Sequence, residues 1–141
     1  MARVSRTSLR PTFSAGTWLD PEDARDYLVQ ILQGLLFAHA SGLYHRDVKP
    51  SNILVSRLGV VKLVDFGLAR PMVPSPSDEH HPYGIAWTGT PDFMSPEQAM
   101  GQHLDHQTDI FSAGIVAHTL ITGRHPFNHP SGVVRPVELI K

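Results

Sequence analysis

The sequence predicts an α+β fold that is mainly helical, with a small β-hairpin and a long loop between two helices. Three patterns carry this prediction: apolar residues at helical spacing from Asp20 to Gly42, two short β-branched runs at 53–55 and 60–64, and a nearly continuous apolar stretch at 108–122. The order of the elements contains no internal repeat. The 141 residues are enough for one modest core and not for two.

The first helix is predicted to begin at Asp20-Pro21-Glu22-Asp23, where an N-cap residue precedes a proline and two acids. Gly42 stands where a left-handed cap would end it. Residues 1–15 show no sustained period, and we expect them to be disordered or to follow a misplaced start. Between these limits, residues at three- and four-residue spacing predict one buried stripe: Ala24, Tyr27, Leu28, Ile31, Leu32, Leu35 and His39.

Two β-branched runs after this helix predict a hairpin. Ile53-Leu54-Val55 and residues 60–64 would form its strands, with Arg57-Leu58-Gly59 as the turn. Residues 71–87 hold four prolines among polar residues, so they predict a long loop.

The second helix, residues 108–122, is apolar almost all round, which predicts burial on most of its faces. Gly123 is expected to end it. Its apolar stretch is much shorter than the ~20 residues that a bilayer span needs, so we expect a buried helix and no membrane span.

The composition is that of an ordinary globular chain, with 41% hydrophobic and 18% charged residues. A net charge of −1 gives no general attraction to nucleic acid, and no nucleic-acid partner is expected. The sequence has no cysteine, which excludes disulfide and thiolate chemistry and fits a reducing compartment. We therefore expect a cytoplasmic location.

Polar residues just before the first strand and just after the second strand of the predicted hairpin have the chemistry that phosphoryl transfer requires. Asp47 can accept the proton of an attacking hydroxyl, and Lys49 places a cation beside it. Asn52 and Asp65 supply oxygen atoms of the kind that Mg²⁺ prefers. Because each lies at the same open end of the paired strands, the hairpin should bring Asn52 and Asp65 close together.

The same residues carry a resemblance to a known family. His45-Arg46-Asp47-Val48-Lys49-Pro50-Ser51-Asn52 and Asp65-Phe66-Gly67 resemble the catalytic loop and the magnesium loop of protein kinases. Ser95-Pro96-Glu97 is similar to the Ala-Pro-Glu motif that closes the activation segment, with serine in place of alanine. Asp109, followed by Phe111 and Gly114, resembles the aspartate of the central helix, and residues 123–127 match the segment after it.

The resemblance covers residues 16–127 and implies a partial C-terminal kinase lobe over 16–141. Lys49 before Pro50, and Thr90 in Gly89-Thr90-Pro91, indicate the serine/threonine type. The same resemblance implies ATP and Mg²⁺ as cofactors and proteins with Ser or Thr as substrates. It also implies that Leu54 packs beneath the adenine ring and that Thr90 forms hydrogen bonds with Asp47 and Lys49. Ser-Pro-Glu-Gln and the residues after Asp109 are closer to bacterial members than to animal ones.

The resemblance also implies structural and regulatory roles. Arg46 would bind a phosphorylated activation loop, with Thr88 favoured as the acceptor over Thr90, Ser75 and Ser77; an unmodified loop is an equally open alternative. The remaining positions would be structural: His45, Phe66, Gly67, Glu97 and Asp109.

Two expected kinase features do not occur in the sequence. No Gly-x-Gly is present, and no lysine precedes Lys49, so the phosphate lid and its anchoring lysine are lacking. We expect the isolated chain to be inactive, and residues 108–122 to favour self-association through apolar surface that further helices would cover. The alternative function is a pseudokinase-like scaffold, although Asp47, Asn52 and Asp65 are all intact.

A metal-binding protein was the other alternative, because the chain has nine histidines. His80-His81 and His103-x-x-His106 are the closest pairs, and neither has the spacing of a zinc site. Solvated loop histidines are the preferred interpretation.

Overall fold

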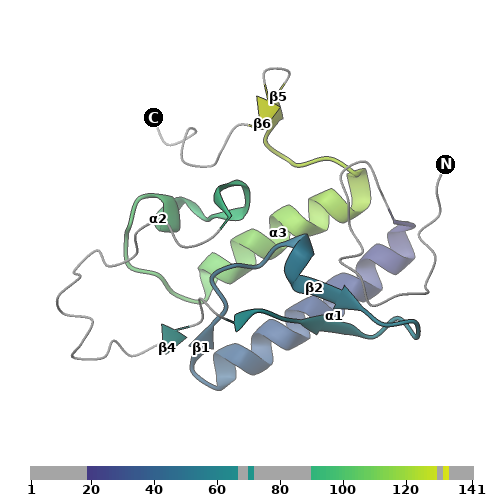
Figure 1. Ribbon diagram of the computed structural model, residues 1–141, viewed down its shortest axis with the longest axis horizontal. Coiled ribbons are helices and arrows are strands. Elements are labelled where there is room, and N and C mark those ends of the chain that lie inside the picture. The colour runs from purple at the N-terminus through teal and green to yellow at the C-terminus, as the bar shows by residue number, and fades with distance from the viewer. Residues whose placement is uncertain (1–18, 67–69, 72–89, 130–131, 134–141) are drawn as a thin grey trace.

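The computed structural model describes residues 19–66, 70–71, 90–129 and 132–133. Two long helices, α1 (Pro21–Ala40) and α3 (Gln107–Thr122), pack against each other, and a hairpin of β2 (Ile53–Val55) and β3 (Val61–Leu63) packs against α1 (Figure 1). This arrangement confirms the predicted α+β, mainly helical fold. The expectations for residues 1–15, Gly67, Thr88 and nearly all of the 71–87 loop lie outside the described residues.

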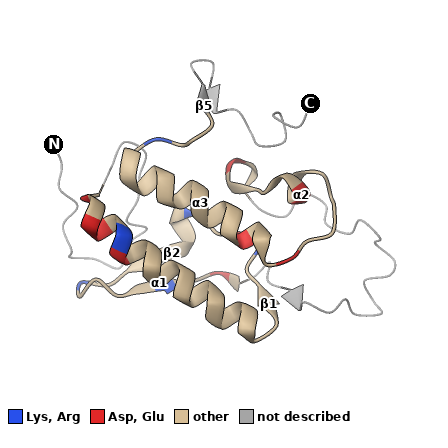
Figure 2. Ribbon diagram, turned by 180° about the vertical axis from the view of Figure 1, so that it is seen from behind, with Lys and Arg blue, Asp and Glu red and all other residues tan. Residues whose placement is uncertain are grey.

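Helix α1 begins where the sequence predicted. The Asp20 carboxylate accepts a hydrogen bond from the Glu22 N–H at 3.1 Å, and Pro21 occupies the first helical position. All of the helix's Asp, Glu, Lys and Arg residues lie in its N-terminal part (Figure 2). Of the predicted stripe, four residues are buried, Leu28 and His39 are half-buried, and Leu32 is exposed, so that part of the prediction is wrong. The buried residues of the helix are Ala24, Tyr27, Ile31, Leu35 and, in addition, Ala38.

The hairpin pairs Ile53 with Leu63 and Val55 with Val61 in antiparallel register. The observed second strand, Val61–Leu63, is shorter than the predicted range 60–64. Val60 belongs to the turn, where its carbonyl accepts from the Ser56 N–H at 2.8 Å. Ile53 and Val55 point into the core, whereas Leu54 is half-buried on the other face of the strand.

Helix α3 contributes seven buried residues to the interior: Thr108, Asp109, Ser112, Ala113, Ile115, Val116 and Leu120. The opposite stripe of the helix is exposed, including Ile110 at 46% and Ile121 at 53% of their surface. Burial on most faces therefore does not hold within this chain, whereas the expected exposure of apolar surface does. The helix therefore has one buried face and one exposed face, although both faces carry apolar residues. Self-association through this stripe stays a prediction.

Several short elements were not predicted. β1 (Leu43–Tyr44) pairs with β4 (Arg70–Pro71), so Pro71 belongs to a strand and not to the predicted loop. β5 (Asn128–His129) pairs with β6 (Gly132–Val133). Helix α2 (Pro96–Ala99) is a single turn that follows a 3₁₀ turn at Pro91–Phe93. Another 3₁₀ turn, Pro50–Asn52, directly precedes β2. Strands of two residues carry too little periodicity to be predicted from sequence.

Two glycines of α3 predict opposite effects of alanine. Gly123 ends the helix in the left-handed region at φ 68°, so Gly123→Ala should lower the free energy of unfolding by about 1 kcal/mol. Gly114 is an exposed interior position where an added Cβ meets nothing within 4 Å, so Gly114→Ala should raise that free energy by about 0.5–1 kcal/mol. Urea denaturation of both variants measures the difference, and a stabilising Gly123→Ala would contradict the assigned cap.

Candidate active site

The carboxylate of Asp47 lies at the centre of a compact polar group. The Lys49 Nζ is 2.7 Å from Asp47 Oδ2 and donates to Thr90 Oγ1, also at 2.7 Å. The Thr90 N–H donates to Asp47 Oδ1 at 3.1 Å. Asp47 is buried and the Lys49 side chain is about one-fifth exposed, so solvent reaches the pair mainly at Lys49.

The Asn52 side chain is held in one orientation by Asp47. Its Nδ2 donates to the Asp47 backbone carbonyl at 2.8 Å and to Asp47 Oδ2 at 3.0 Å. With the amide nitrogen committed, Oδ1 is the atom that faces away, and no described residue donates to it. The amide oxygen is therefore available as a ligand.

Asp65 lies next to Asn52 through the backbone. The Val64 N–H donates to the Asn52 carbonyl at 2.9 Å, which extends the β2–β3 ladder to the residue before Asp65. Asp65 is exposed and has φ 62°, a conformation that is uncommon outside glycine and concentrates at functional sites. A carboxylate and an uncommitted amide oxygen, on residues at the same end of the β2–β3 hairpin, are oxygen ligands of the kind that Mg²⁺ prefers.

His45 holds together the segment of residues 45–52, which we call the catalytic segment after the role expected of Asp47. The Asp47 N–H donates to His45 Nδ1 at 3.3 Å, so Nδ1 carries no proton and Nε2 donates to the Val64 carbonyl at 3.1 Å. The imidazole thus connects Asp47 to the residue that precedes Asp65. The Phe66 ring lies 4.4 Å from it, centroid to centroid.

Asp109, on α3, fixes the backbone just before Asp47. It is fully buried; its Oδ2 accepts from the His45 N–H at 2.8 Å and its Oδ1 accepts from the Arg46 N–H at 2.7 Å. His39, near the end of α1, contributes a third contact to Oδ2 at 2.8 Å. One carboxylate therefore joins α1, α3 and the catalytic segment.

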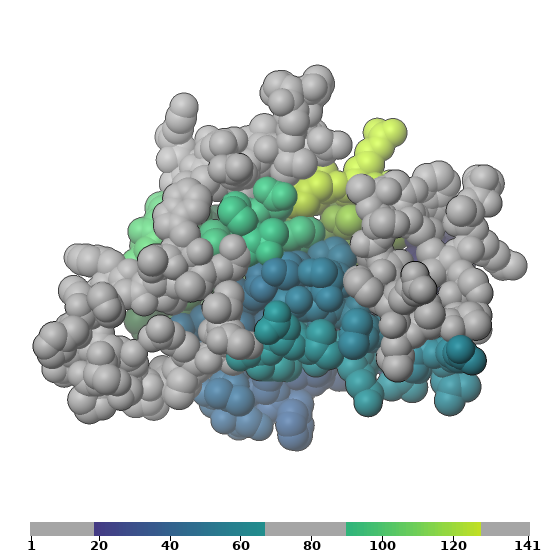
Figure 3. All heavy atoms as spheres, viewed as in Figure 1, coloured from purple at the N-terminus to yellow at the C-terminus, as the bar shows by residue number. Residues whose placement is uncertain are grey.

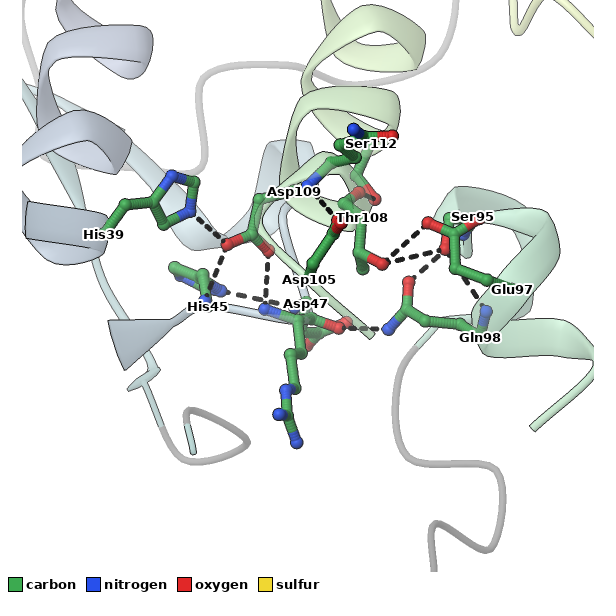
Figure 4. A network of polar contacts seen from close by, with 12 residues as sticks. His39, His45, Asp47, Ser95, Glu97, Gln98, Asp105, Thr108, Asp109 and Ser112 are labelled. Atoms are coloured by element: carbon green, nitrogen blue, oxygen red, sulfur yellow. Dashed lines mark hydrogen bonds and ion pairs between the residues drawn. The ribbon is translucent and has the colours of Figure 1, made fainter. Parts of the chain in front are cut away.

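Helix α2 completes the network (Figure 4). Ser95 and Gln98 form a reciprocal capping box. Glu97 accepts from the buried Thr108 hydroxyl at 2.7 Å, and the Ser95 and Thr108 hydroxyls lie 3.3 Å apart. Gln98 Nε2 donates to the Arg46 carbonyl at 2.9 Å. Since Thr108 and Asp109 are neighbours on α3, the contacts form a closed ring through α2, the catalytic segment and α3.

The structure brings most of the sequence-predicted residues together. In the space-filling view the green surface that follows Thr90 adjoins the blue surface of the catalytic segment (Figure 3). Leu54 lies on the face of β2 that points away from the core, and the Arg46 guanidinium lies 5.7 Å from the centroid of the Tyr44 ring. Thr88 and Gly67 lie outside the described residues.

Sequence reasoning missed three members of the network: His39, Gln98 and Thr108. His39 was counted only as part of the buried stripe. Ser95-x-x-Gln98 is a capping-box pattern, which was available in the sequence and would have predicted α2. Nothing in the sequence marked Thr108 as the partner of Glu97, because the two residues meet only through the packing of α2 on α3.

Two features are absent from the part of the chain that the structure describes. No group of three or more His, Asp or Glu residues that could hold a metal occurs there. None of the helices in the same residues is both long enough and apolar enough to cross a membrane.

Comparison with known proteins gives one consistent family. A probable serine/threonine-protein kinase, PknB, of Bifidobacterium longum is 38% identical over 133 residues, which are 94% of this chain and 19% of that protein. The probable serine/threonine-protein kinase SCO3848 of Streptomyces coelicolor is 39% identical over 90% of this chain and 19% of its own length. The corresponding protein CPE1738 of Clostridium perfringens is 43% identical over 80% of this chain and 16% of its own.

The chain therefore spans about a fifth of the length of the curated relatives it matches. The model of the protein kinase domain matches residues 1–137, nearly the whole chain. These matches and the polar network around Asp47 agree, and the chain belongs to the protein kinase domain family.

Proposed function

We propose that this chain forms the catalytic half of a serine/threonine protein kinase, which transfers the γ-phosphate of ATP to Ser or Thr hydroxyls of proteins. The observation that carries the proposal is the contact set of Asp47 with Lys49, Asn52 and Thr90, at 2.7–3.1 Å. The names of the bacterial relatives support the serine/threonine class. Those relatives, and a sequence without cysteine, also support a bacterial cytoplasmic setting.

In this proposal Asp47 accepts the proton of the substrate hydroxyl. Its Oδ2 is shared with Lys49 and Asn52 and its Oδ1 with Thr90, so the carboxylate cannot rotate away from the incoming hydroxyl. Lys49 stabilises negative charge on the transferring phosphoryl group. The Thr90 hydroxyl accepts a hydrogen bond from the Lys49 ammonium at 2.7 Å and so holds Lys49 in place.

Asn52 and Asp65 would hold Mg²⁺ through Oδ1 and the carboxylate, and Leu54 would pack beneath adenine from the outer face of β2. When bound, the metal neutralises charge on the phosphates of ATP. Arg46 would bind a phosphate on Thr88 by a charge-assisted contact, which is the regulatory part of the proposal. His45, Phe66, Gly67, Glu97 and Asp109 would be structural.

A pseudokinase-like scaffold is the second candidate. The sequence feature that favours it is the lack of a Gly-x-Gly motif and of any lysine before Lys49. The geometry of the described site favours the kinase instead, because a scaffold has no need to hold Asp47, Asn52 and Lys49 in mutual contact.

Activity should depend on an added ATP-binding lobe. We expect the 141-residue chain alone to transfer no measurable ³²P from ATP to a Ser/Thr-containing protein, because it lacks several groups that stabilise the transferred phosphoryl. Residues 16–141 fused behind the ATP-binding lobe of a bacterial serine/threonine kinase should transfer phosphate, at rates approaching the ~1–100 s⁻¹ of protein kinases.

The added lobe alone is the control. A fusion that folds by circular dichroism and binds Mg·ATP, yet transfers nothing, would favour the scaffold. Normal turnover by the isolated chain would contradict the role assigned to the added lobe.

A further inference from the structure

The backbone of Arg46 has an unfavourable conformation that other residues must stabilise. Its φ is 64°, in the left-handed region, which costs about 1–2 kcal/mol for a residue with a Cβ. Such a conformation persists only where neighbouring groups hold it. Arg46 immediately precedes Asp47, so the direction of the Asp47 side chain depends on how the peptide between them is held.

That peptide is held on both sides. Its carbonyl, from Arg46, accepts from Gln98 Nε2 at 2.9 Å, and its N–H, from Asp47, donates to His45 Nδ1 at 3.3 Å. Because a peptide unit is planar, these two contacts fix its rotation. The preceding peptide is fixed separately, by the contact of the Arg46 N–H with Asp109.

The Gln98 side chain has only one orientation that satisfies its partners. Oε1 accepts from the Ser95 N–H at 3.1 Å, while the Gln98 N–H donates to Ser95 Oγ at 3.3 Å. A flipped amide would set Nε2 against an N–H and Oε1 against a carbonyl, so flipping is excluded. Figure 4 shows the side chain reaching from α2 toward the catalytic segment.

We propose that Gln98 is a positioning residue, which orients the Arg46–Asp47 peptide and thereby aims the Asp47 carboxylate. This inference rests on the proposed kinase function. It ties the activity of Asp47 to the position of α2, so any movement of α2 would be transmitted to Asp47 through one side-chain amide.

Gln98→Glu removes the donor while keeping the acceptor. The glutamate can still accept from the Ser95 N–H, but its second oxygen faces the Arg46 carbonyl. Gln98→Leu removes the donor without adding a charge. Gln30→Glu is the matched control, since Gln30 makes the same pair of contacts far from Asp47: its Nε2 donates to the Gly59 carbonyl at 3.0 Å and its Oε1 accepts from the Val61 N–H at 2.9 Å.

The first measurement needs no activity. In the 141-residue chain, amide hydrogen exchange followed by NMR should show the Asp47 N–H exchanging about tenfold faster in both Gln98 variants than in Gln30→Glu. In the lobe fusion, both should lower kcat by about 10- to 100-fold, as expected for a misplaced catalytic group, with KM for ATP within about twofold of wild type.

Gln30→Glu should leave kcat within about twofold of wild type, because the hydrogen bond that it loses lies far from Asp47 and does not orient its carboxylate. The proposal is overturned if the Asp47 N–H stays as protected in Gln98→Leu as in wild type, or if kcat falls equally in Gln98→Leu and Gln30→Glu. An inactive wild-type fusion would sink the proposed function, while the exchange measurement would still decide the role of Gln98.

Discussion

Asp47→Asn is expected to lower kcat of the lobe fusion by about 10²- to 10⁴-fold, the range that a positioned acid–base group contributes. The asparagine keeps the size of the side chain but cannot accept a proton. Its NH₂ group would also face donors in either orientation: the Lys49 ammonium and the Asn52 amide in place of Oδ2, or the Thr90 N–H in place of Oδ1. Initial rates of ³²P transfer at saturating ATP measure the effect.

The control for this change is Asp92→Asn, which removes a carboxylate that takes no part in the contacts described around Asp47. It should leave kcat within about twofold. KM for ATP should change much less than kcat in Asp47→Asn, because Asp65 and Leu54 are untouched and Asn52 keeps its hydrogen bond to the backbone carbonyl of residue 47. A variant that retains a tenth or more of wild-type kcat would remove Asp47 from its assigned role.

Asp109→Leu should cause the largest loss of stability of any single change in the network. The buried N–H groups of His45 and Arg46 would lose their acceptor, at about 1–3 kcal/mol each. The expected fall in the free energy of unfolding is therefore about 2–6 kcal/mol, a large part of what a small domain has. The free energy of unfolding of Asp109→Asn should lie between those of wild type and Asp109→Leu, since one oxygen can still accept from one of the two donors.

Urea denaturation of the 141-residue chain, followed by far-UV circular dichroism, tests this order. Asp105→Asn is the matched control: its carboxylate accepts one N–H, from Gln107 at 2.7 Å, in an exposed position just before α3. It should lower the free energy of unfolding by about 1 kcal/mol or less. Equal losses in Asp105→Asn and Asp109→Leu would contradict the role of Asp109 in joining α1, α3 and the catalytic segment.

Long local patterns made the main elements predictable. α1 was located by a cap, a proline and a repeated apolar spacing, all within one stretch of chain. The β2–β3 hairpin followed from two β-branched runs and a glycine turn. The burial of α3 was not predictable in the same way, because a helix that is apolar all round gives no sign of which face meets a partner.

For the site, the sequence alone determined the residue types and their order along the chain: the carboxylates, the amide and the lysine that phosphoryl transfer needs. Those types and spacings identify the family because few other chemistries require them together. They contain no information about what orients Asp47.

Only the tertiary structure decided that orientation. Asp109 and Gln98 lie 63 and 52 residues from Arg46 in the sequence, and no local period connects them to it. They reach the Arg46 backbone because α3 packs on α1 and because the Thr108 hydroxyl joins α2 to α3. The residue before Asp47 keeps its left-handed conformation through hydrogen bonds that exist only after those helices have packed.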